Sequence, residues 1–198
     1  MNELSDVSSQ GQKQRKAFGM APWDGGNVLS SGGSLSKAEL AGAELAGADL
    51  SGRDLKDADL SRARLSNANL EDADLAEANL EDADLSGANL RGARLTGANL
   101  KHTDLRSASL EQTDLTEVDL AGARLVGASF AEADLTGTSL ENLDLTNCVF
   151  ETAVLNKIFF LGAVLAGASF EDAQLEKANL SRTDLRGANF HSAVLTET

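Results

Sequence analysis

The sequence predicts an all-β solenoid, a tube wound from short extended segments and corners, because its hydrophobic residues recur with a period of five. Every fifth residue from Leu35 to Leu195 is leucine, except at five of these positions, where it is phenylalanine. Two positions earlier, alanine fills 23 of the 32 slots from Ala38 to Ala193. A helix buries residues at a period of 3.6 and a strand at a period of 2. A period of five fits neither alone, but it fits a short strand followed by a corner.

Within each five-residue repeat, the central Leu or Phe (position i) and the residue at i−2 are expected to face the inside of the tube. In an extended segment these two positions point to one side and the residue at i−1 points to the other. The residue at i−1 is nearly always polar, as in ADLSGANLRGARLTGANL at 83–100. Positions i+1 and i+2 must form the bend, because five is odd and the next Leu would otherwise face outward. Glycine recurs at i+2, where a tight turn suits it.

The pattern leaves open how many sides each coil has, because three, four or five would all keep the leucines inside. Phenylalanine recurs in every fourth repeat at Phe130, Phe150, Phe170 and Phe190, and four sides would stack these residues into one column. The A(D/N)LXX consensus of residues 35–198 resembles that of the pentapeptide-repeat family. The resemblance implies a right-handed four-sided (quadrilateral) parallel β-helix, and with four repeats in each coil this segment makes about eight coils.

Residues 1–34 lack the repeat and are rich in Ser, Gly and Gln. We therefore divide the chain into a flexible N-terminal arm, 1–34, and the β-helix, 35–198. Apolar residues of the arm are candidates to cap the first coil, since the end of a solenoid exposes strand edge and core. The chain has no apolar run long enough to cross a membrane and no signal-peptide core at its start. We expect a bacterial cytoplasmic protein that makes no contact with membranes, with a secreted effector as the alternative.

The composition argues against an enzyme. The single cysteine, Cys148, falls on an inward i−2 slot and is expected to be a small core residue, and it excludes an intramolecular disulfide framework. The two histidines, His102 and His191, are far apart in sequence and fall on predicted corners. No zinc spacing, no nucleophile–His–acid set and no phosphate-binding glycine loop occurs. We therefore expect no catalytic residue, no metal and no cofactor.

The formal charge of −14 belongs to the repeats, because the arm holds three basic and three acidic residues. One predicted coil, residues 65–84, has seven carboxylates and no cation, and it is our candidate acidic interaction surface. These carboxylates are Glu71, Asp72, Asp74, Glu77, Glu81, Asp82 and Asp84. Such acidity disfavours direct binding to nucleic acid and makes a basic DNA-binding protein a plausible partner. The alternative is that the acidic residues only keep the rod soluble.

The outward polar pattern breaks once. Four consecutive i−1 residues are apolar, and with Leu161 they form a candidate apolar belt: Val149, Val154, Phe159, Leu161 and Val164. Contiguous exposed apolar residues usually mark an interface; the alternatives are local packing variation or docking of the arm. The C-terminal repeats, with no capping helix after them, are the candidate end of a homodimer. The residues at that end are Phe190, Val194 and Leu195.

Two functions are consistent with a non-enzymatic rod that acts by protein–protein contact. The resemblance implies one of them, since fluoroquinolone-resistance members of the family are acidic dimers that bind DNA gyrase. On that hypothesis the chain is a DNA mimic that modulates a type II topoisomerase or protects it from inhibitors. Unlike those members, it lacks a dimerisation helix and a register-breaking loop, so no functional residue can be transferred. The alternative is a general interaction scaffold, a bacterial regulator or a secreted effector that uses the belt at 149–164.

Overall fold

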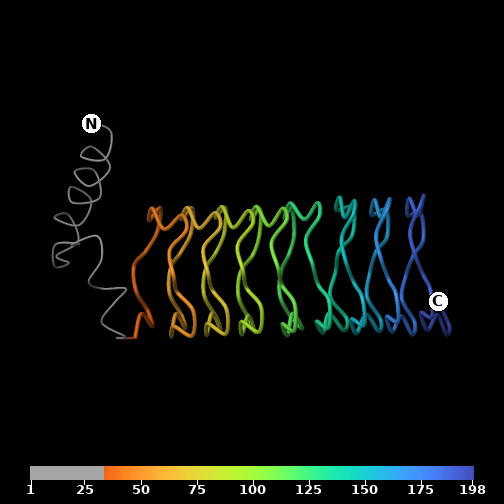
Figure 1. The fold of residues 1–198 in the computed structure, drawn as a ribbon, viewed down its shortest axis with the longest axis horizontal. Helices are drawn as coiled ribbons and strands as arrows, with labels where there is room; N and C mark the ends of the chain where they lie inside the picture. Colours follow the sequence, from red (N-terminus) through yellow and green to blue (C-terminus); the bar gives the residue numbers. More distant parts are fainter. Residues whose placement is uncertain (1–33) are drawn as a thin grey trace. The chain divides into compact units, whose positions relative to one another are not determined.

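The computed structural model describes residues 34–198, and Leu35–Thr198 forms one compact unit. Its coils stack side by side along a single axis in chain order (Figure 1). Parallel bridges join residues that are 20 positions apart, from Glu39 with Asp59 to Gln174 with Val194. A coil therefore contains four repeats, and the expectation of four sides is confirmed. The predicted capping by residues 1–33 lies outside the described residues.

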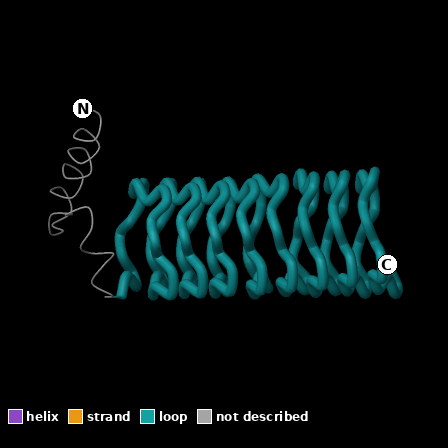
Figure 2. Tube along the Cα trace, viewed as in Figure 1, coloured by secondary structure: helices purple, strands orange, loops and turns teal. Residues whose placement is uncertain are grey.

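The extended segments are too short to count as strands. Within 34–198 there is no helix and no strand longer than an isolated bridge residue, and Figure 2 shows the described chain as loop throughout. We name the four faces by their outward i−1 residues, which recur every 20 positions: face A starts at Glu39, face B at Glu44, face C at Asp49 and face D at Asp54. Each face is preceded by a two-residue corner.

Every corner is a β-turn whose third residue lies in the left-handed region. The backbone N–H of Ala38 donates to the carbonyl of Leu35 at 3.0 Å, and the same bond recurs along the chain. Every i+2 position from Lys37 to Glu197 has a positive φ, and most of these positions are not glycine, for example Lys157 at 59°. The predicted glycine turns are confirmed. The repetition also holds ordinary residues in a conformation that costs them roughly 1–2 kcal/mol.

The interior contains the predicted leucines, phenylalanines and alanines. The rings of Phe130, Phe150, Phe170 and Phe190 stack in parallel, with centroids 5.1, 5.0 and 4.7 Å apart. This spacing is close to the roughly 4.8 Å between neighbouring strands of a sheet. Cys148 is buried, and its thiol donates to the carbonyl of Leu125 at 3.0 Å. This burial confirms the predicted core position, and it raises the pKa of the thiol to about 12.

The ladder of parallel bridges opens at one junction. Among the described residues, no bridge joins Asp119 with Ser139 or Arg124 with Asp144, although bridges of this kind flank them on both sides. The opening is confined to faces A and B. On face D the N–H of Leu115 still donates to Asp134 at 2.8 Å, so the coils remain joined on that side.

Candidate interaction surfaces

Charge is distributed unevenly around the four faces. Face D with its preceding corner (51–54 and the equivalent positions of each later coil, to 191–194) carries eleven carboxylates and three arginines, a net charge of −8. Face C with its corner (46–49 to 186–189) carries one carboxylate and two arginines, a net charge of +1. Faces A and B with their corners carry −4 and −3. More than half of the net negative charge of the rod therefore lies along one quarter of its circumference.

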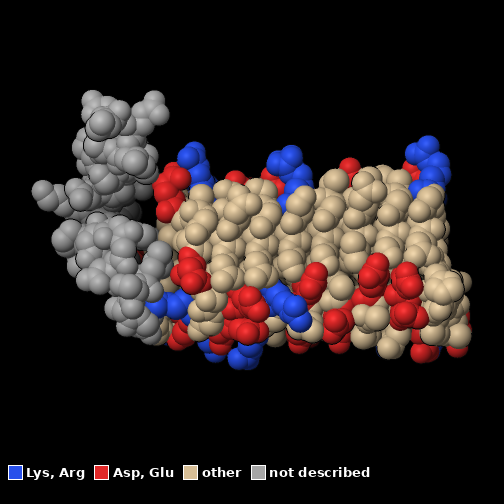
Figure 3. Space-filling model, viewed as in Figure 1, with Lys and Arg blue, Asp and Glu red and all other residues tan. Residues whose placement is uncertain are grey.

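The C-terminal half of that quarter has no lysine or arginine at all. We call its seven carboxylates the acidic edge: Glu111, Asp114, Glu132, Asp134, Glu151, Glu171 and Asp172. No ion pair within residues 34–198 uses any of these seven groups. Figure 3 shows carboxylates gathered along one long edge, beside a broad lengthwise strip that carries no charge. The acidic edge therefore presents carboxylates that no ion pair of the described chain neutralises.

Hydrogen bonds from the neighbouring coils hold several of these carboxylates in place. The hydroxyl of Ser129 donates to Glu111 at 3.0 Å, and that of Ser169 donates to Glu151 at 3.1 Å. The side-chain amide of Gln112 donates to Glu132 at 2.9 Å. A carboxylate oxygen accepts several hydrogen bonds, so these contacts orient the groups and leave their charge available to a partner.

The structure does not bring the predicted acidic residues of the coil at 65–84 onto one face. Glu71, Asp72 and Asp74 belong to the face D quarter, Glu77 to the corner before face A, and Glu81, Asp82 and Asp84 to the quarter of face B. Cations of the next coil lie beside several of them. The guanidinium of Arg94 lies 3.5 Å from Asp74, and Lys101 interacts with Glu81. These seven carboxylates encircle the rod and are partly neutralised.

The acidic edge was not predicted, because its members are neighbours across the coils and not along the chain. The signal was available in the four-sided arrangement that the resemblance implied. Every twentieth residue from Glu111 gives the i+1 corner positions 111, 131, 151 and 171, of which three are glutamate. In a solenoid, residues one coil apart are closer in space than residues five positions apart.

Unlike the carboxylates of the acidic edge, several carboxylates on faces A and B form ion pairs. The Asp104 carboxylate lies 2.6 Å from Arg106 and 3.0 Å from Arg124. The hydrogen bond from Arg106 is the main reason why the pKa of Asp104 is lowered. Likewise, the hydrogen bond from Lys101, at 2.9 Å, lowers the pKa of Asp119. These carboxylates are already occupied within the fold.

The apolar belt forms one turn around the rod, and its exposure is concentrated on two faces. Phe159 on face A is 43% exposed and Val164 on face B is 37% exposed. Leu161 lies half-buried in the corner between them, whereas Val149 and Val154 lie half-buried on faces C and D. The predicted belt is therefore asymmetric, with its accessible part on faces A and B.

At the C-terminal end, the hydrophobic residues of the last coil are accessible. Val194 is 49% exposed and Leu195 is 44% exposed, while Phe190 is half-buried at the end of the aromatic column. These are the three residues that the sequence suggests for a dimer contact.

The described residues were predicted to hold no metal site, and both histidines were predicted to lie on corners. No group of three or more His, Cys, Asp or Glu side chains within 34–198 is arranged to hold a metal ion. Both histidines lie on corners, as predicted, and they are 89 positions apart. The described part of the chain also contains no helix of the length and apolar character that a membrane span requires.

The chain matches a family model and several solved structures. A model for pentapeptide repeats matches residues 34–72, 54–92, 73–112, 113–151, 144–182 and 173–198. HetL, a pentapeptide repeat protein involved in heterocyst differentiation regulation from the cyanobacterium Nostoc sp. strain PCC 7120, is 37% identical. That match covers 81% of this chain and 73% of HetL, with a TM-score of 0.58. No curated protein matches the chain.

Two other solved structures also match the chain, with lower TM-scores. QnrB1, a plasmid-mediated fluoroquinolone resistance protein, is 16% identical over 83% of this chain and 89% of its own, with a TM-score of 0.37. A pentapeptide repeat protein from the Arabidopsis thaliana thylakoid lumen is 29% identical over 53% of this chain and 77% of its own, with a TM-score of 0.24. The family match, which spans the whole β-helix, shows that the chain belongs to the pentapeptide-repeat family, whose fold is a right-handed four-sided β-helix.

Proposed function

We propose that this protein is a non-enzymatic binding protein whose acidic edge docks on a basic surface of a partner protein. The observation that carries the proposal is the row of seven carboxylates that form no ion pair within residues 34–198. The ion pairs of the described rod all involve carboxylates outside this edge. A long edge of unpaired charge of one sign favours and steers association with a surface of the opposite sign.

The partner that we propose is a DNA-binding protein, with the type II topoisomerase gyrase as the first candidate. At about 4.8 Å per coil, the four coils with these carboxylates occupy roughly 19 Å of axis, or one charge per roughly 3 Å. B-DNA presents one charge per about 1.7 Å of axis. The acidic edge alone therefore reaches more than half the charge density of a duplex. The same sign of charge disfavours direct binding to nucleic acid.

Supercoiling by gyrase, titrated with this protein in the presence and absence of a fluoroquinolone, tests the finer proposal. We expect inhibition or drug protection at micromolar concentration. Replacing four glutamates of the edge with lysine (Glu111, Glu132, Glu151 and Glu171→Lys) should abolish the effect. A matched control makes the same change of charge near face A (Glu39, Glu77, Glu117 and Glu197→Lys). Equal losses in both variants would show that only the net charge matters and would reject the acidic edge.

We also propose a homodimer through the C-terminal end, supported by the exposure of Val194 and Leu195. Replacing Leu195 with Glu should shift the mass measured by light scattering from dimer to monomer. A monomeric mass for the unmodified protein would reject this part of the proposal.

A second candidate function is a regulatory scaffold that binds through the apolar belt. The exposure of Phe159 and Val164 favours it, because these are large apolar side chains on two adjoining faces. The similarity to HetL, which is involved in heterocyst differentiation regulation, adds the regulation of differentiation as a candidate setting. Phe159→Ser should disrupt the scaffold function and leave a gyrase effect unchanged, whereas the lysine variant of the edge should do the opposite.

A further inference from the structure

The opening in the ladder leaves backbone groups of two successive coils without partners. On one side, the N–H groups of Leu120, Gly122 and Leu125 have no hydrogen-bond partner within residues 34–198. In the preceding coil, the equivalent N–H groups of Leu100 and His102 donate to the next coil at 3.1 and 2.9 Å. Across the opening, the carbonyls that would accept the missing bonds belong to Ser139, Glu141 and Asp144. Unpaired N–H and C=O groups of this kind are a template for another extended segment.

Two large side chains lie at the opening, in inward slots where alanine is the commonest residue. Val118 and Leu143 lie at inward i−2 positions and are 6% and 9% exposed, whereas most inward alanines of the preceding coils are fully buried. Adding methyl groups to a close-packed interior displaces the backbone. The two residues flank the opening from its two sides, Val118 on face A of one coil and Leu143 on face B of the next.

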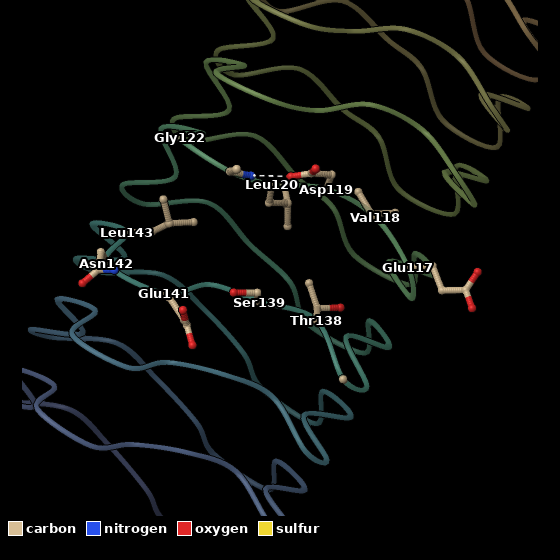
Figure 4. A pocket seen from close by; sticks show the side chains of 12 residues that line it. Glu117, Val118, Asp119, Leu120, Gly122, Thr138, Ser139, Glu141, Asn142 and Leu143 are labelled. Atoms are coloured by element: carbon tan, nitrogen blue, oxygen red, sulfur yellow. Dashed lines mark hydrogen bonds between the residues drawn. The ribbon is translucent and has the colours of Figure 1, made fainter.

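The opening forms a cleft of about 530 Å³. Figure 4 shows residues of two successive coils facing each other across it, with Val118, Asp119 and Leu120 on one side and Thr138, Ser139 and Leu143 on the other. Its rim carries carboxylates from both sides, including those of Glu117 and Glu141. No lysine or arginine of the described chain lines the cleft, and Lys101 nearby is held by Asp119 at 2.9 Å.

The exposed part of the apolar belt lies directly beside this cleft. Parallel bridges join Ser139 with Phe159 and Asp144 with Val164, so the belt is one coil away from the second side of the opening. Backbone groups that lack partners, an acidic rim and accessible apolar side chains are therefore found together on faces A and B. The acidic edge lies on the quarter of face D and is separate from this site.

We propose that the opening is a docking site for an extended segment of a partner protein that carries alternating basic and apolar side chains. In such strand addition, main-chain hydrogen bonds provide affinity and the alternate side chains provide specificity. The segment would pair with the N–H groups of Leu120 and Gly122 or with the carbonyls of Ser139 and Glu141. Its basic side chains would point outward and meet the acidic rim, and its apolar ones would point inward and pack on Val118, Leu120 and Leu143.

The test uses labelled nine-residue peptides of alternating lysine and valine, with binding followed by fluorescence anisotropy. A second peptide of the same sequence is N-methylated at every backbone nitrogen, which keeps its charge, removes its N–H donors and sterically blocks strand pairing along both of its edges. We expect the unmodified peptide to bind at least tenfold more tightly. It should also slow hydrogen exchange at Leu120, Gly122 and Leu125 while leaving Gly127 unchanged. Equal affinities of the two peptides would overturn the proposal and indicate only attraction to an acidic protein.

A variant that restores the alanine pattern provides the second arm. Val118→Ala with Leu143→Ala should close the ladder, protect the amides of Leu120 and Leu125 without peptide, and weaken binding of the unmodified peptide at least tenfold. Ile158→Ala is the matched control, because it also shortens an inward side chain but lies where the ladder is intact. Retention of full peptide binding by the closed double variant would overturn the proposal.

Discussion

The coils at 55–94 and those at 116–164 share the same repeat but differ in their inward slots and in their ladders. In the first region every inward i−2 residue from Ala58 to Ala93 is alanine and at most 1% exposed, and the bridges that join these coils continue without interruption. In the second region several inward residues are larger and the ladder opens once. The central leucines are equally buried in both. Large i−2 residues accompany the opening at Val118 and Leu143 but not at Ile158, where the ladder is intact, so the buried leucines alone do not determine whether successive coils close on each other.

The largest difference between the two regions should appear on removing a central leucine. Leu80 and Leu120 occupy equivalent positions on face A, but only Leu120 lines the cleft. Leu80→Ala should lower the free energy of unfolding by about 3–5 kcal/mol, because it leaves a closed cavity. Leu120→Ala should cost about 2–3 kcal/mol, because its surroundings are already open. Urea unfolding of the two variants measures both values, and equal losses would contradict the role that we assign to the opening.

Introducing valine and leucine at the equivalent inward positions of the regular region should open its ladder of parallel bridges. Ala58→Val with Ala83→Leu places the two residues 60 positions earlier with the same spacing and faces. Overpacking of this kind costs about 1–3 kcal/mol per site. Hydrogen exchange should accelerate at Leu60 and Leu65, whose N–H groups now donate to the next coil at 2.8 and 2.7 Å. Each single substitution serves as a control, and unchanged exchange in the double variant would show that other residues cause the opening.

Smaller effects on stability are expected at the corner residues whose backbone has a positive φ. Gly92 has a φ of 64°, and a Cβ atom there would collide with the carboxylate of Asp72. Gly92→Ala should therefore lower the free energy of unfolding by about 1–2 kcal/mol. Glu117, beside the opening, has a φ of 63°. Glu117→Gly relieves its strain but makes the unfolded chain more flexible, so we expect a gain of less than about 1 kcal/mol. Thermal unfolding of both variants measures the sign of each change in stability. A loss of stability in Glu117→Gly would contradict the expectation.

The smallest expected effect is on the pH dependence of stability. It concerns the last ion pair before the opening, which joins Asp104 and Arg124. Asp104 contacts Arg124 of the next coil, whereas the following pair on this face, Arg124 with Asp144, is not bridged. The hydrogen bond from Arg106 lowers the pKa of Asp104 below 3.8. A lowered pKa in the folded state stabilises the protein above the unfolded value, and this stabilisation is lost as pH falls below about 4. Unfolding midpoints between pH 5 and 2 should fall less steeply for Asp104→Asn than for the unmodified protein.

The sequence was sufficient to predict which residues face inward and outward, because one five-residue repeat dictates both. The resemblance supplied the four sides, and the bridges between positions 20 apart confirm them. The opening could not be predicted from the repeat pattern. Whether a large side chain swells a coil or separates it from the next depends on how far the neighbouring backbone can relax, which a pattern of residue types does not contain.

The candidate surfaces were predicted less completely than the fold. The exposed part of the belt, Phe159 and Val164, was found from its apolar residues at outward positions. The acidic edge was missed because its successive members are separated by up to 20 positions, and a count along the chain favoured the coil at 65–84. The left-handed corners at non-glycine residues were also missed, since lysine and glutamate carry no local signal for positive φ.

The four-sided coil also restricts how a gene for such a rod can lengthen. Duplication of a single pentapeptide would keep every leucine inside, so the core would tolerate it. All later repeats would, however, rotate by one face relative to the earlier ones. The carboxylates of Glu132, Glu151 and Glu171 would then no longer lie in line with Glu111. Only insertions or deletions of four repeats at a time preserve both interior and surface, so selection for a binding edge should favour rods that differ in length by whole coils.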